Sequence, residues 1–72
     1  SLPDLLRDSE REVAALRRDK KALYNDTKID RFERKRQLEK LDKDIEKVMA
    51  EMIKASRENH RAQRDKRNGT RN

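Results

Sequence analysis

Apolar residues recur at alternating steps of four and three over the first third of the chain. This spacing places them along one side of an α-helix, as in the seam of a coiled coil. The seven positions, two of them polar, are Leu2, Leu6, Ser9, Val13, Leu16, Lys20 and Leu23. Ser1 and Asp4, with Pro3 between them, have the composition of a helix start. The pattern predicts a first helix over about residues 3–24.

A second run with the same spacing follows, and it is longer. Its positions are Leu38, Leu41, Ile45, Val48, Met52 and Ala55, with Met49 and Ile53 widening the apolar stripe. This pattern predicts an amphipathic helix over about residues 31–58. After Ser56 the apolar spacing stops.

Turn-forming residues separate the two runs at positions 25–30. Asn25 and Asp26 have side chains that bond to nearby backbone groups in turns. Asp30, three residues before Glu33, matches a helix N-cap with its capping-box partner. The sequence therefore predicts an all-α fold, an antiparallel, coiled-coil-like helical hairpin over residues 1–56, followed by a basic tail at 57–72. The predicted helix–helix seam consists of Leu6, Val13, Leu16, Leu23, Leu38, Leu41, Ile45 and Val48.

Two further expectations concern the ends of the hairpin. At the turn, Ile29 and Phe32 are expected to cap the core together with Leu23 and Tyr24. At the other end, a first helix of about 21 residues is about 30 Å long, and an equal length of the second helix ends near residue 51. We therefore expect Met52 and Ile53 to extend beyond the first helix. With Leu2 and Leu5 they are the candidate contact for a protein partner.

The composition limits how much core such a hairpin can have. Half of the 72 residues are charged and 31% are hydrophobic, whereas ordinary globular domains are about 45–50% apolar. A hairpin of this kind needs further packing, so we expect a protein partner, an oligomeric assembly or the remainder of a larger chain. A chain that begins with Ser1 rather than Met also favours a part of a larger protein.

The basic tail is the clearest functional feature. Its basic residues are Arg57, Arg61, Arg64, Lys66, Arg67 and Arg71, against two acidic residues. Such a tail is either a solvated terminus, a site for nucleic-acid phosphates or a site for an acidic protein surface. It has no aromatic residue on which bases of a single strand would stack.

Residue patterns for catalysis are missing from the sequence. There is no cysteine, His60 is the one histidine, and the acidic residues are scattered among Lys and Arg. A zinc site needs several ligands. We therefore predict no enzyme, and no catalytic, cofactor-binding or metal-binding residues. No apolar run approaches the roughly 20 residues of a membrane span.

Residues 5–54 resemble a helical-hairpin pattern of very large phage and mobile-element proteins, namely internal virion or ejection proteins and large polyvalent proteins. The pattern has a charged helix, a Tyr-Asn-Asp turn and a capped helix containing Glu-Lys-Arg and Leu-Asp. The matching pieces here are residues 17–26, which end in Tyr24-Asn25-Asp26, and residues 30–36, followed by Leu41-Asp42. Thr27 stands where the pattern has proline.

The resemblance implies a structural segment of a virion protein complex for DNA ejection, located in the phage particle or the bacterial cytoplasm. This is the favoured hypothesis. The first alternative is a small dimeric nucleic-acid-binding protein that pairs two hairpins into a four-helix bundle and uses its basic tail. The second is a coiled-coil regulator that binds one protein partner through Met52 and Ile53.

Overall fold

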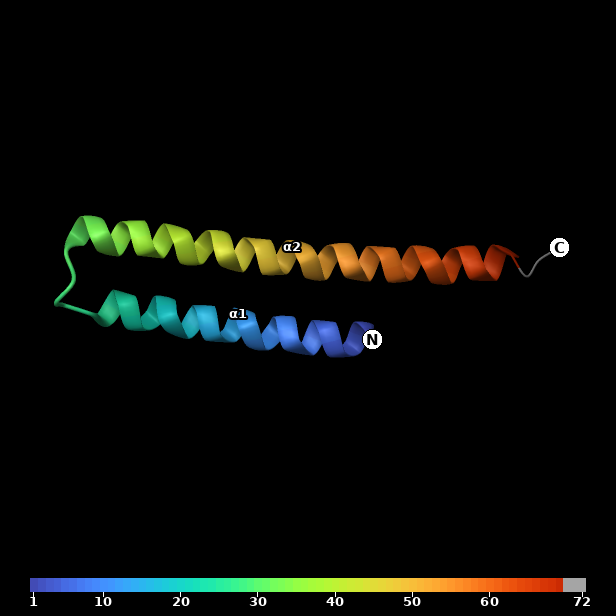
Figure 1. Cartoon of the computed structure of the whole chain (residues 1–72), viewed down its shortest axis with the longest axis horizontal. Helices are drawn as coiled ribbons and strands as arrows, with labels where there is room; N and C mark the ends of the chain where they lie inside the picture. The colour runs from blue at the N-terminus through green and yellow to red at the C-terminus, as the bar shows by residue number, and fades with distance from the viewer. Residues whose placement is uncertain (70–72) are drawn as a thin grey trace.

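The computed structural model describes residues 1–69, which form two helices, α1 (Leu2–Asn25) and α2 (Arg31–Gly69). The helices lie side by side and antiparallel (Figure 1), so the predicted all-α hairpin is confirmed. The radius of gyration is 18.2 Å, against about 11 Å for a compact domain of this length. The molecule is therefore a rod, with principal extents of 66 × 18 × 10 Å.

Local side-chain chemistry explains where α1 begins and ends. The Ser1 hydroxyl accepts a hydrogen bond from the backbone N–H of Asp4, at 3.4 Å. This contact occupies one of the N–H groups that a helix start leaves unpaired. At the other end Asp26 is extended, with φ −81° and ψ 106°, and its carboxylate accepts a 2.9 Å hydrogen bond from the N–H of Lys28. The turn is thus held by an aspartate, as its sequence predicts.

Asp30 starts α2. Its Oδ2 accepts hydrogen bonds from the N–H groups of Phe32 (2.9 Å) and Glu33 (3.3 Å), and its carbonyl accepts from the N–H of Arg34 (2.8 Å). The capping-box expectation is met only in part. The carboxylate of Glu33 accepts hydrogen bonds from Arg36 and Gln37 instead of reaching back toward the cap.

α2 continues to Gly69, past the predicted end at residue 58, so the basic tail is helical through its described part. The prediction ended the helix where the apolar spacing ends, but that spacing reports packing rather than helicity. Arg, Lys, Gln, Glu and Ala all favour helix, and adding residues to an existing helix is easier than nucleating one. Gly69, the last described residue, is helical and has no positive φ.

The core between the helices is small. Its buried apolar residues are Val13, Leu23 and Val48. Tyr24 is 61% exposed and Phe32 is 80% exposed, so the expectation that they cap the core is wrong. Phe32 lies nine residues, or about two and a half helical turns, before Leu41 of the seam. It therefore lies on the face of α2 opposite α1.

Candidate functional site

The predicted helix–helix seam falls between the two helices. Val13, Leu23 and Val48 are buried, and the other five seam residues, Leu6, Leu16, Leu38, Leu41 and Ile45, are half-buried. These side chains hold α1 against the first part of α2. The last residue of α2 in this packed region is the half-buried Ala55.

A polar pair marks the register of the hairpin. Lys20, one of the two polar seam positions, donates a hydrogen bond to the carboxylate of Asp42 on α2, at 2.5 Å. This contact raises the pKa of the Lys20 ammonium group. Lys20 lies about a turn and a half before the end of α1, whereas Asp42 lies about three turns into α2. α2 therefore begins farther out than α1 ends, as Figure 1 shows at the turn.

This register corrects the predicted overhang of Met52 and Ile53 beyond the first helix. Because α2 is shifted toward the turn, Met52 does not extend beyond α1; it is half-buried and lines a pocket with Val13 and Ala14. Ile53 is 51% exposed and lies in a different pocket, formed by α2 alone. Leu2 is half-buried in the first turn of α1, and Leu5 is 46% exposed. Met52 and Ile53 thus line different pockets, and their contact with a protein partner stays a prediction.

The turn end of the rod carries basic residues that are engaged within the chain. A guanidinium nitrogen of Arg34 donates a hydrogen bond to the carbonyl of Asp26, next to the negative end of the α1 dipole. Arg36 donates two hydrogen bonds to the carboxylate of Glu33. The hydrogen bonds from Arg36 and then from Gln37 lower the pKa of Glu33.

The other end of the rod is a bare helix, and we call its described part, residues 56–69, the basic arm. Figure 1 shows α2 running well past the N-terminus of α1 at this end. Every described residue from Ser56 to Gly69 is exposed. Its charged residues are Arg57, Glu58, Arg61, Arg64, Asp65, Lys66 and Arg67. The arm thus carries five positive and two negative side chains with no packed core beneath them.

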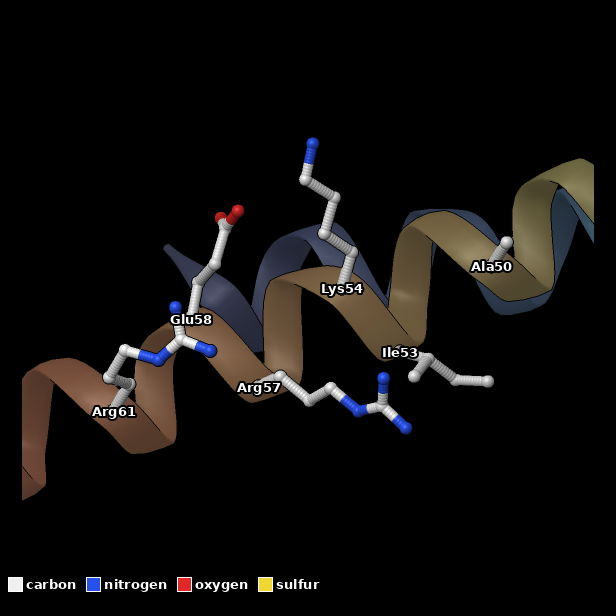
Figure 2. A pocket seen from close by; sticks show the side chains of 6 residues that line it. All are labelled: Ala50, Ile53, Lys54, Arg57, Glu58 and Arg61. Atoms are coloured by element: carbon white, nitrogen blue, oxygen red, sulfur yellow. The ribbon is translucent and has the colours of Figure 1, made fainter.

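Three of the predicted contact residues share one face of the arm. Arg57 and Arg61 line a pocket with Ile53 and Lys54 (Figure 2), and they also line a second pocket with Arg64. All the residues of both pockets come from α2. We call the residues Lys54, Arg57, Arg61 and Arg64 the basic stripe. Since Arg57 follows the buried Val48 by about two and a half turns, the stripe faces away from α1.

The structure separates the remaining predicted residues from this stripe. Lys66 follows Arg57 by nine residues, which places it on the opposite side of the arm. Arg67 is exposed and lies beside the stripe, one turn beyond Arg64. Arg71 lies outside the described residues. Sequence reasoning missed Lys54, although its spacing of three residues before Arg57 is the signal that places it on the same face.

Residues 1–69 offer neither a cluster of metal ligands nor a membrane-spanning helix. His60 is exposed and lines the second pocket of the arm, and residues 1–69 contain no group of three potential metal ligands. Neither described helix combines the length and apolarity needed to cross a membrane. Comparison with family models, curated proteins and solved structures gives no match for this chain.

Proposed function

We propose that this chain is a non-enzymatic structural module, a helical hairpin that packs against other protein within a larger assembly. The observation that carries the proposal is the balance of its apolar side chains. Three apolar residues are buried, whereas five large ones, Leu5, Tyr24, Phe32, Met49 and Ile53, are exposed. A hairpin that exposes more large apolar side chains than it buries gains stability when a neighbouring protein covers them.

The resemblance of residues 5–54 to hairpins of internal virion and ejection proteins supports a finer form of the proposal. In that form the module belongs to a phage-type virion complex and is located in the particle or, before assembly, in the bacterial cytoplasm. The module serves assembly by positioning its neighbours, with the hairpin as the packed part and the basic arm extending from it.

Sedimentation equilibrium of the 72-residue chain, with circular dichroism on the same samples, tests the proposal. We expect a helical monomer of marginal stability, whose melting temperature does not change with concentration, because the covering protein is missing and short helices are marginal in water. A stable helical dimer, with a melting temperature that rises with concentration, would overturn it in favour of a stand-alone four-helix bundle.

A variant pair locates the surface if a dimer is found. Met49→Ser/Ile53→Ser removes exposed apolar side chains from α2, whereas Lys43→Ser/Lys47→Ser changes two exposed basic residues of the same helix. A dimer held by the apolar side chains dissociates in the first variant and persists in the second.

A further inference from the structure

The basic stripe gathers four exposed basic side chains on one face of α2, and its central members have no partner. Arg57 and Arg61 make no ion pair or hydrogen bond within the described residues. Arg64 has a contact of 3.8 Å from its Nε to Asp65, and both side chains are more than half exposed. By contrast, Arg34 and Arg36 at the turn end are bonded to Asp26 and Glu33. Arg57 and Arg61 thus present positive charge that no ion pair within the described residues neutralises.

The geometry of the stripe suits a linear polyanion. From Arg57 to Arg64 the helix rises about 10 Å, and the three guanidinium groups lie on one side of it. A nucleic-acid duplex carries about one phosphate per 1.7 Å of its axis, so the same length presents about six phosphates. In Figure 2 the α1 ribbon lies behind α2, and the side chain of Arg57 extends from α2 away from it. A straight, exposed helix of this length has room to lie against a duplex without contact from α1.

The composition of the arm favours one kind of anionic partner over the others. It contains no Phe, Tyr or Trp, and stacking on such side chains is the usual means of holding single strands. Its face beyond Ile53 contains no large apolar residue, whereas the core of a protein–protein interface is apolar and rich in aromatic residues. Phosphate binding requires clustered Lys and Arg alone. Double-helical nucleic acid therefore fits the arm better than an acidic protein does.

We propose that the basic stripe of Lys54, Arg57, Arg61 and Arg64 binds the phosphate backbone of double-helical nucleic acid without reading its sequence. The inference deepens the proposed function and rests on it in one respect, namely that the packed hairpin anchors the arm. Four phosphate contacts give a slope of about −3.6 for log K against log salt. Binding then weakens about 100-fold between 50 and 200 mM salt.

Fluorescence anisotropy with the full chain and a labelled 20-base-pair DNA duplex of mixed sequence tests the proposal. The stripe variant Arg57→Gln/Arg61→Gln is compared with the matched control Arg11→Gln/Arg18→Gln, which removes the same charge from exposed positions of α1. Glutamine keeps the helix, since its propensity is close to that of arginine. We expect the stripe variant to bind about 10-fold more weakly at 200 mM salt, with the slope reduced by about 1.8, and the control to stay within about 2-fold of wild type.

Several outcomes would overturn the proposal. Equal losses in the two variants would mean that net charge, not the stripe, drives binding. If a single strand with the same number of phosphates bound as tightly as the duplex, the stripe would have no preference for a double helix. Binding to poly-glutamate but not to DNA or to an RNA duplex would assign the stripe to an acidic protein, and no binding to any of the three would leave it a solvated face.

The two proposals fail separately. A dimer in sedimentation overturns the assembly module without affecting the anisotropy result. If the stripe variant and its control bind the duplex with equal affinity, the proposed phosphate site is wrong. The oligomeric state is unaffected by that result. Circular dichroism of both variants, in the presence and absence of duplex, verifies that they have the same helicity.

Discussion

The two parts of α2 form the same secondary structure for different reasons. Residues 31–55 place an apolar side against α1 and contribute the buried Val48 and the half-buried Leu41 and Ile45. The basic arm continues the same helix without any buried residue. In the first part packing holds the helix, whereas in the arm the helix depends on intrinsic propensity and on continuation from the packed turns.

This difference shows that helicity and packing are separate properties of a charged sequence. The arm is free to contact a partner because no part of the hairpin covers it. For the same reason, changes in the arm are expected to alter binding, and changes in the packed part are expected to alter stability.

The largest effect is expected from placing a charge in the packed part. Val48 is 6% exposed, so Val48→Asp buries a carboxylate with no partner, at a cost of about 3–5 kcal/mol. We expect the hairpin to lose its helical circular dichroism at 25 °C.

The matched control introduces the same residue into the arm. Ala62 is exposed, so Ala62→Asp changes only local helix propensity, by less than about 1 kcal/mol. If Val48→Asp and Ala62→Asp lowered helicity equally, the distinction between the packed part and the arm would be wrong.

A smaller loss of helical circular dichroism is expected from a proline substitution within the arm. Gln63→Pro removes a backbone N–H and clashes with the carbonyl of Asn59, which disfavours helix there by about 3 kcal/mol. We expect the arm beyond residue 59 to lose helicity while the thermal midpoint of the hairpin stays the same, because the packed region ends at Ala55. Circular dichroism during a thermal scan measures both, with Gln63→Ala as the helix-preserving control. A lowered midpoint in Gln63→Pro alone would show that the arm stabilises the hairpin.

The smallest effect concerns pH. Hydrogen bonds from Arg36 and Gln37 lower the pKa of Glu33 in the folded chain. A carboxyl group of this kind contributes stability above its unfolded pKa of about 4.3, and the contribution is lost as the pH falls through the lowered folded value. We expect the midpoint of wild type to fall more between pH 7 and pH 3 than that of Glu33→Gln. The difference is small because the pair is exposed and screened by solvent.

Glu58→Gln is the control for this pH dependence, since Glu58 lies on the arm, outside the packed part. It is expected to keep the full wild-type decrease at acid pH. If the midpoint of Glu58→Gln fell as little between pH 7 and pH 3 as that of Glu33→Gln, the pH dependence would not come from the contacts of Glu33.

Much of the fold is predictable because its signals are local. Ser1, Asp26 and Asp30 bond to backbone groups within four residues of themselves, so short sequence patterns locate the turn and the helix starts. Alternating steps of three and four residues identify the side of each helix that packs. The extension of α2 to Gly69 also agrees with helix propensity, whereas the apolar pattern, which reports packing, ends at Ala55.

The candidate site was predictable only in part. The cluster of basic residues is evident from composition, and helical spacing groups Arg57 with Arg61 and Arg64. The separation of Lys66 from this face follows only once the tail is known to be helical. That Arg57 and Arg61 lack partners, whereas Arg34 and Arg36 have them, required side-chain positions.

The sequence by itself determined two helices, their starts, the turn and the packing side of each, because all of these depend on neighbours within about one helical turn. The tertiary structure decided the register. The contact of Lys20 with Asp42 and the packing of Val13 beside Met52 join residues far apart in the chain, and counting residues from the turn does not reveal which of them meet. That register moves Met52 into the packed region and leaves the basic arm as the part of α2 that extends beyond α1.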